Sequence, residues 1–333
     1  MKNKISTPML ASLRIPMIGA PMFIVSSKEL VAAQCMAGIV GAFPALNARP
    51  QESLCTWIDY VEDRIGRWND EHPEQPAAPY AVNLIVHPSN ERLHADLDSV
   101  CDRKVPIVIT SLNPPGDVVA RVHGYGGMVL HDAATLRHAR KAIDSGVDGV
   151  VLVTAGAGGH TGTINPLAFV DEVRQIYDGL VIVSGCISHG RQVLAAQIMG
   201  ADLVYVGTRF IASHEANAST HYRRMIVESS AQDVVRTNVV TGLHANYLRG
   251  SFAALGIDIE ALSPRDSSSF SFGKRGDGSQ VKAWRDVWSA GQGVGGIRDI
   301  QPASKIIDNL VKEYQAARSQ WSNADPVRYS AWK

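Results

Sequence analysis

Residues 149–162 read GVVLVTAGAGGHTG, an apolar run that leads directly into four glycines around His160. The run Gly149–Val153 has the length and composition of a β-strand. Glycines at the density that follows let a backbone approach a neighbouring group closely. The stretch raises two questions: which fold repeats such strands, and whether His160 does chemistry at the end of one.

Seven other short apolar runs resemble Gly149–Val153, and longer stretches with helical spacing separate most of them. The expected strands are Ile15–Gly19, Ile39–Ala42, Tyr80–Ile85, Pro106–Thr110, Met128–His131, Gly149–Val153, Leu180–Ser184 and Leu203–Gly207. The expected helices among them are Val31–Ala37, Ser53–Trp68, Ala133–Asp144, Pro166–Tyr177 and Arg191–Met199. Alternation of this kind implies parallel strands joined by helical crossovers. Eight such units, spaced regularly after residue 100, favour an α/β fold of the (β/α)8 TIM-barrel type, with a doubly wound sheet as the alternative.

The pattern changes after Phe210, where an insertion follows the eighth strand. It contains two helical segments and a polar stretch that predicts a mobile loop: Thr220–Glu228, Phe252–Leu255 and SPRDSSSFSFGKRGDGS at 263–279. A last helix over Ala303–Ala317 would close the barrel. We therefore expect a barrel domain made of residues 1–212 and 283–333, with a smaller, mainly helical insertion domain over residues 213–282.

The bulk composition limits the partners and the compartment. Lys plus Arg and Asp plus Glu number 32 each, so the chain has no net electrostatic reason to bind nucleic acid or an anionic membrane. The four cysteines form no CxxC pair and the other candidate ligands show no metal spacing, so neither a disulfide scaffold nor a metal site is expected. With no signal peptide and no run of transmembrane length, we expect a cytoplasmic protein, with a homodimer as the default assembly.

Active sites of TIM barrels lie at the carboxyl ends of the strands, so the residues that follow each strand are the candidates. The loops after the seventh and eighth strands carry Gly185–Cys186 and Gly207–Thr208. Barrels often bind phosphate there, because glycines let backbone N–H groups point at phosphate oxygens, and Thr208 adds a hydroxyl. Ordinary turns between strand and helix remain the alternative interpretation of these glycines.

The stretch GAGGHT at 156–161 fails as a dinucleotide-binding fingerprint. Thr161 stands where the third glycine of G-x-G-x-x-G belongs, and the next strand ends without an acidic residue for a ribose. His160 lies among glycines at the carboxyl end of a strand, where it could take a proton from a carbon acid or hold an anionic substrate. A histidine in a surface loop is the competing interpretation.

Several short motifs together resemble the nitronate monooxygenases, also called 2-nitropropane dioxygenases. The motifs occur in the family's order: Gly19–Met22, Val82–Leu84, Ala157–Gly162, Ser184–Gly185, Met199–Asp202, Val206–Phe210 and the late Ala290–Gly293. The resemblance covers the barrel portion, about residues 15–212. FMN-dependent enoyl-acyl-carrier-protein reductases and some NADH:quinone reductases share much of this pattern.

The resemblance implies an FMN-binding barrel with a smaller domain over the active site. It implies that the FMN phosphate lies on Gly185, Cys186, Gly207 and Thr208, and the isoalloxazine ring near Ala20, Pro21, Met22, Asn83, Gly158 and Gly159. His160 matches the family's catalytic histidine, as a base toward a neutral nitroalkane or as a hydrogen-bonding partner of a bound nitronate. The implied reaction converts an alkyl nitronate, such as propionate 3-nitronate, and O2 into a carbonyl compound and nitrite.

Three positions depart from the family pattern. Cys186 replaces a second glycine that is common in the phosphate loop, and we expect binding to survive if its φ angle is negative. Asp132 stands where some relatives carry a lysine near the flavin, and His131 is the neighbour that could restore a positive charge. The approach to His160, Ala155–Ala157, is less polar than in several relatives.

Two other functions use the same sequence features. An FMN-dependent NAD(P)H reductase of quinones or enoyl thioesters is the alternative, for which Lys274, Arg275 and Lys282 would offer a basic landing surface. A non-catalytic flavin or phosphate-ligand binder is the third, and His160 beside the flavin disfavours it. Trp284 and Trp288 are expected to pack the closing segment.

Overall fold

The computed structural model describes residues 10, 12–266 and 284–322, and it confirms the predicted TIM barrel. Eight strands form one parallel sheet in the order β1-β9-β8-β6-β5-β4-β3-β2. A parallel bridge between Ile18 and Val40 joins the two outer strands, with a 2.7 Å hydrogen bond from the N–H of Gly19 to the carbonyl of Val40. The strands are β1 (Met17–Gly19), β2 (Gly41–Pro44), β3 (Tyr80–Val86), β4 (Ile107–Leu112), β5 (Met128–Ala133), β6 (Gly149–Val153), β8 (Leu180–Ser184) and β9 (Leu203–Val206).

Helices cover the outside of the barrel. They are α1 (Lys28–Met36), α2 (Ser53–Glu71), α3 (Leu93–Asp102), α4 (Val118–His123), α5 (Leu136–Asp144), α6 (Pro166–Arg174), α7 (Gly190–Ile198) and the short α8 (Thr208–Ile211). Ser27, Thr135 and Asn165 start α1, α5 and α6, because each side-chain oxygen accepts a hydrogen bond from a backbone N–H two or three residues ahead. Helices α3 and α4 were not predicted from the sequence.

The core has an inner and an outer layer, because side chains along a strand alternate between its two faces. Inside the barrel, Ile18, Ala81, Ile109, Leu130 and Val151 belong to one apolar cluster. The residues between them face the helices and belong to a larger cluster. Together the two layers fix the strands rigidly, so the loops at the carboxyl ends have a firm base.

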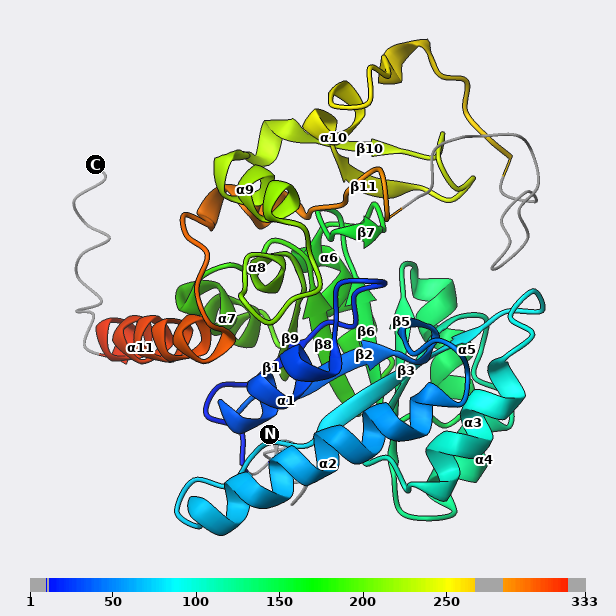
Figure 1. The fold of residues 1–333 in the computed structure, drawn as a ribbon, viewed down its shortest axis with the longest axis vertical. Helices are drawn as coiled ribbons and strands as arrows, with labels where there is room; N and C mark the ends of the chain where they lie inside the picture. The colour runs from blue at the N-terminus through cyan, green and yellow to red at the C-terminus, as the bar shows by residue number, and fades with distance from the viewer. Residues whose placement is uncertain (1–9, 11, 267–283, 323–333) are drawn as a thin grey trace.

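The insertion after β9 lies above the carboxyl ends of the strands in Figure 1. It contains α9 (Thr220–Glu228), α10 (Arg249–Ala253) and, in addition, two strands that were not predicted, β10 (Val234–Thr237) and β11 (Ala245–Leu248). Strand β11 pairs on one side with β10 and on the other with β7 (Gly159–His160), a two-residue strand from the loop after β6. The insertion therefore holds the backbone of His160 directly.

The chain then returns to the barrel. Residues 284–302 pass over the carboxyl ends and include the 3₁₀ turn η7 (Gln292–Gly296), and α11 (Ala303–Ser322) packs against α7 and α1. The predicted closing helix is confirmed and extends further than expected. Most of the predicted mobile loop, the three basic residues Lys274, Arg275 and Lys282, and the predicted boundary at residues 282/283 fall outside the described residues.

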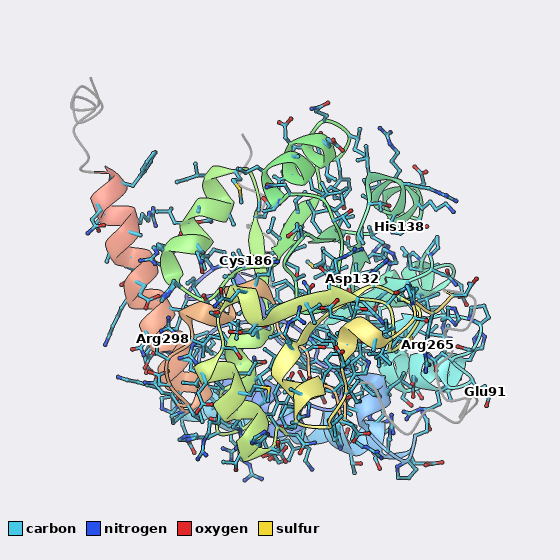
Figure 2. All side chains as sticks on the ribbon, turned by 90° about the horizontal axis from the view of Figure 1, so that it is seen from above. Glu91, Asp132, His138, Cys186, Arg265 and Arg298 are labelled. Carbon is cyan, nitrogen blue, oxygen red and sulfur yellow. The ribbon has the colours of Figure 1, made fainter. Side chains whose placement is uncertain are left out.

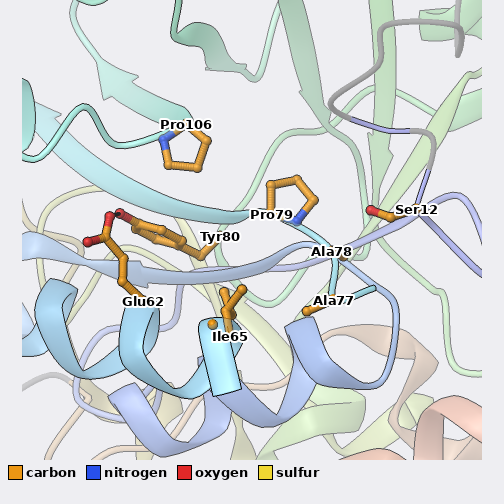
Figure 3. A pocket seen from close by; sticks show the side chains of 9 residues that line it. Ser12, Glu62, Ile65, Ala77, Ala78, Pro79, Tyr80 and Pro106 are labelled. Atoms are coloured by element: carbon orange, nitrogen blue, oxygen red, sulfur yellow. Dashed lines mark hydrogen bonds between the residues drawn. The ribbon is translucent and has the colours of Figure 1, made fainter. Parts of the chain in front are cut away.

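The opposite end of the barrel carries a shallow hollow of about 370 Å³ between α2 and the first residues of β3 and β4 (Figure 3). Tyr80 and Glu62 meet there in a 2.7 Å hydrogen bond, among mostly apolar neighbours. This hollow lies at the amino ends of the strands, away from the loops that follow them. Within the described ranges, no helix is long and apolar enough to cross a membrane.

Candidate functional site

The loops after β6 and β8 meet in a contact that requires glycine. Thr154, directly after β6, donates its hydroxyl to the carbonyl of Ser184 at 2.7 Å. Gly185 follows with φ +125°, and a Cβ atom there would lie 2.7 Å from the Thr154 Oγ1. A side chain at position 185 would therefore be strained and would also separate the two loops.

The returning segment completes the mouth of the barrel. The N–H of Gly291 donates to the Thr208 Oγ1 at 2.9 Å, and the N–H of Gln292 donates to the carbonyl of Gly156 at 2.8 Å. A Cβ atom at Gly158 would lie 2.8 Å from the Gly291 nitrogen. The Thr208 oxygen accepts from Gly291, and its hydroxyl proton remains available to donate to a ligand.

The first and last barrel strands bring their loops to the same place. A Cβ atom at Gly207 would lie 3.4 Å from the Met22 sulfur and 3.5 Å from the Ala20 Cβ, which is ordinary contact. Ala20, Pro21, Met22, Gly207 and Thr208 are all partly exposed, in contrast to the buried strands before them. The structure thus gathers the predicted residues of the loops after β1, β6, β8 and β9 around one accessible mouth.

His160 lies at the edge of this mouth, on β7. Its backbone pairs with Ala245 of β11, and its imidazole meets the indole of Trp284 edge-on, with ring centroids 5.4 Å apart. Burial lowers the pKa of His160 to about 4, because the charged imidazolium would lose its hydration. The side chain is therefore neutral at pH 7 and can accept a proton.

Asn246 fixes the loop that carries His160. It is 2% exposed, and its amide Nδ2 donates to the carbonyl of Ala157 at 2.7 Å. The N–H of Thr161 donates to the carbonyl of His244 at 3.2 Å on the other side of His160. Asn246 was not predicted from the sequence, although an amide within the apolar strand ANYL needs such a partner and is a signal in itself.

Polar side chains replace the apolar inner layer at the mouth. Asn83 is 4% exposed, and its Nδ2 donates to the carbonyl of Ile109 at 3.1 Å and to the Ser111 Oγ at 2.9 Å. The Ser111 hydroxyl in turn faces Asp132 of β5 and lowers the pKa of its carboxyl. Seen from the side of the insertion, Asp132 and Cys186 lie near the middle of the molecule (Figure 2). The mouth thus has a polar floor of Asn83, Ser111 and Asp132.

Two of the departures from the family pattern differ from what was expected, because the condition set on Cys186 is not met and His131 is not placed to compensate for Asp132. Cys186 has φ +59°, in the left-handed region that favours glycine, so the condition of a negative φ is not met. His131 cannot restore a positive charge beside Asp132, because neighbouring residues on a strand face opposite ways. It is 2% exposed, its Nδ1 lies 2.8 Å from the Thr110 Oγ1, and burial lowers its pKa to about 4.

The fold and this candidate site are those of a TIM-barrel enzyme, a class whose active centres lie at the carboxyl ends of the strands. One side of the mouth is built from glycines and Thr208, and the other carries a neutral, half-buried histidine against an aromatic ring. Of the His, Cys, Asp and Glu residues that the structure describes, no three are grouped so that they could hold a metal ion.

The chain belongs to the nitronate monooxygenase family, a family of oxidoreductases, whose model matches residues 7–313. A nitronate monooxygenase of Paraburkholderia phytofirmans is 29% identical in an alignment 287 residues long that covers 75% of this chain and 77% of that protein. A relative from Mycobacterium tuberculosis is 27% identical over 244 residues, and the chain spans only 64% of that relative's length.

Solved structures agree with this assignment. FabK of Thermotoga maritima superposes with a TM-score of 0.76 at 25% identity, over 93% of this chain and 96% of FabK. A nitroalkane oxidase of Streptomyces ansochromogenes superposes with a TM-score of 0.73 at 25% identity, over 92% of this chain and 97% of that one. Both cover the barrel and the insertion, so the whole described architecture is that of these proteins.

Proposed function

We propose that the protein is an FMN-dependent enzyme that oxidises alkyl nitronates, such as propionate 3-nitronate, with O2 to a carbonyl compound and nitrite. The reaction balances as two nitronates and one O2 giving two carbonyl compounds and two nitrites. In each nitronate the carbon–nitrogen bond breaks, a C=O bond forms with one oxygen atom of O2, and the nitrogen leaves as nitrite. Family membership and the nitroalkane oxidase neighbour support the substrate class. The observation that carries the proposal is His160, neutral and half-buried beside a glycine-lined mouth.

The residues of the mouth fit FMN. Gly156, Gly158 and Gly185 leave no room for a Cβ atom because the neighbouring loops pack against their backbone, so no side chain from these three positions occupies the mouth. We assign the phosphate to Gly185, Cys186, Gly207 and Thr208, where backbone N–H groups and the Thr208 hydroxyl can donate to its oxygens. The isoalloxazine ring would lie near Ala20, Pro21, Met22, Asn83, Gly158 and Gly159. When bound, FMN supplies the electron transfer that the side chains of this chain cannot perform.

His160 would act on the substrate in one of two ways. Toward a neutral nitroalkane, the unprotonated ring nitrogen takes the proton from the carbon next to the nitro group, which leaves the nitronate anion and a histidinium. Toward a nitronate that arrives as an anion, the ring N–H donates a hydrogen bond to a nitro oxygen. Trp284 and the pairing of β7 with β11 hold the ring in place for either role.

The competing function is an NAD(P)H-dependent reductase of quinones or enoyl thioesters, which would use the same barrel and cofactor. The structural similarity to FabK is the observation that favours this alternative. In both cases the partners are small molecules, and the nitronate enzyme needs O2 in addition. The substrate that reduces the cofactor therefore separates the two functions.

Anaerobic mixing of the FMN-loaded protein with propionate 3-nitronate, and separately with NADH and NADPH, tests the proposal. Loss of flavin absorbance with the nitronate, and none with either nicotinamide, is the expected result. Rapid bleaching by NADH or NADPH without a response to the nitronate would instead identify a reductase. Release of nitrite in proportion to O2 consumed, measured on readmission of air, checks the product side of the reaction.

A further inference from the structure

Asp132 is a carboxylic acid at the floor of the barrel mouth. It follows Met128 and Leu130 on the inward-facing side of β5, and both of these belong to the inner apolar cluster. The residue keeps some exposed surface, but its Oδ1 atom is shielded from solvent and has no hydrogen-bond partner among the residues that the structure describes. A buried polar atom of this kind is costly unless a ligand satisfies it.

The polar side chains beside Asp132 donate toward it, from Asn83 to Ser111 and from Ser111 to the Asp132 carboxyl. Asn83 donates through Nδ2 to the Ser111 Oγ, so the single hydroxyl proton of Ser111 is directed to Asp132. Asp132 therefore receives one donor from β4. Across the barrel, Tyr205 of β9 also lies in the inner cluster, and its hydroxyl likewise has no partner within the described part of the chain.

Asp148 and Asp202, two other carboxylates of the barrel, have both hydrogen-bond donors and basic partners. Asp148 accepts from the N–H of Val129 at 2.7 Å and meets His123 at 2.9 Å. Asp202 pairs with Arg174 and accepts from the N–H of Val181 at 2.8 Å. Both receive backbone N–H bonds and a basic partner, whereas Asp132 has only a hydroxyl.

Electrostatics therefore favour the protonated acid at Asp132. Desolvation raises its pKa to about 7, and the Ser111 hydroxyl acts weakly in the opposite direction. From the elements packed against it, Tyr205 is the titratable group that faces it, and its pKa is raised both by burial and by the Asp132 carboxylate. Among the described residues, no Lys, Arg or His side chain contributes to the pKa of Asp132.

We propose that Asp132 is a cofactor-binding residue that carries a proton when FMN is bound and donates a hydrogen bond through Oδ1 to an acceptor atom of the isoalloxazine ring. The inference rests on the proposed function, because it requires FMN in the mouth. The oxidised ring presents two carbonyl oxygens and unprotonated ring nitrogens but a single N–H, so a carboxylic acid finds more acceptors on it than a carboxylate finds donors. A ring bound there would also shield Asp132 from water, which would favour the protonated acid further.

The affinity for FMN, measured from the quenching of flavin fluorescence between pH 6.5 and 9, tests this assignment. Binding to the native protein should weaken with rising pH, by on the order of 50-fold for an acid that titrates near pH 7 in the free protein. Asp132→Asn keeps a donor that does not titrate, so its affinity should change by less than about 3-fold over the same range. Asp144→Asn, on the exposed side of α5, is the matched control and should follow the native profile.

The outcomes separate the two proposals. The FMN phosphate titrates near pH 6 in every variant, so the difference between the native and Asp132→Asn profiles isolates Asp132. Tight FMN binding with identical profiles for both proteins would overturn the role of Asp132 and leave the proposed function intact. Affinity that rises with pH in the native protein would overturn it as well, because the carboxylate would then be the binding form. No FMN binding at any pH would overturn the proposed function itself.

Discussion

The imidazole of His160 and the indole of Trp284 meet in a T-shaped contact, with ring planes at 86°. Trp284 has φ +67°, a left-handed conformation that is costly for a residue with a large side chain. On its other side the indole stacks on Tyr247 of β11, with ring centroids 5.4 Å apart. The returning segment thus holds Trp284 in a strained backbone conformation, with its indole packed between His160 and Tyr247.

Removal of the Trp284 indole should change the pKa of His160. Trp284→Ala exposes the imidazole to water, so its pKa should rise from about 4 toward the ordinary value of about 6.5. The acid limb of the pH–rate profile with a neutral nitroalkane should move up by about one to two pH units, because the base must be unprotonated. Trp288→Ala is the control, since Trp288 stacks on Tyr222 rather than on His160. An unmoved acid limb in Trp284→Ala would show that the indole does not set the pKa of His160.

The role of His160 as a base predicts a difference between two substrates. His160→Asn removes the proton acceptor but keeps a hydrogen-bond donor of similar reach. Turnover of a neutral nitroalkane should fall by about 10²- to 10⁴-fold, while turnover of the pre-formed nitronate should fall by less than about 10-fold. Stopped-flow measurements on the FMN-loaded variant compare the two directly. Equal losses on both substrates would remove the base role.

Much of the barrel is readable from the sequence because its signals are local. Each apolar run of four to six residues had the composition of a strand, and the glycines after β6, β8 and β9 marked the loops of the mouth. Helix α3 was missed because its apolar stripe is broken by Asp96, which is buried against Arg92 at 2.9 Å. From the sequence alone, a buried carboxylate is taken for a surface residue, because its partner is visible only in the structure.

The parts of the site that were missed depend on contacts between distant segments. Strand β7 is two residues long and exists only because β11 pairs with it, so no local pattern announces it. Trp284 was expected only to pack the closing segment, yet it also contacts His160. Asp132 was noted as a departure, but its isolation from cationic groups depends on which side chains the barrel brings together.

Gly156 should be required for stability and for FMN binding, because a side chain there would collide with Cys186 in the neighbouring loop. Gly156 and Gly126 have φ values of +87° and +86°, so alanine costs about 1–2 kcal/mol of backbone strain at either site. A Cβ atom at Gly156 would lie 2.6 Å from the Cys186 sulfur, whereas nothing lies within 4 Å of one at Gly126. Gly156→Ala should therefore be less stable than Gly126→Ala by a further ~1–3 kcal/mol and should lose FMN. Chemical denaturation and the flavin content of the two purified variants decide this, and equal results would contradict the close approach of the two loops.

His131 should make the protein sensitive to acid. Its pKa is about 4 in the folded chain and about 6.5 when unfolded, so between these values only the unfolded state binds the proton. The free energy of unfolding should therefore fall as the pH drops from 6.5 to 4, by about 3 kcal/mol from this residue alone, and then level off. His131→Asn can still bond Thr110 but does not titrate, so its stability should decline less over this range. His94→Asn, on the exposed face of α3, should decline as the native protein does, and parallel curves for all three proteins would show that His131 titrates normally in the folded state.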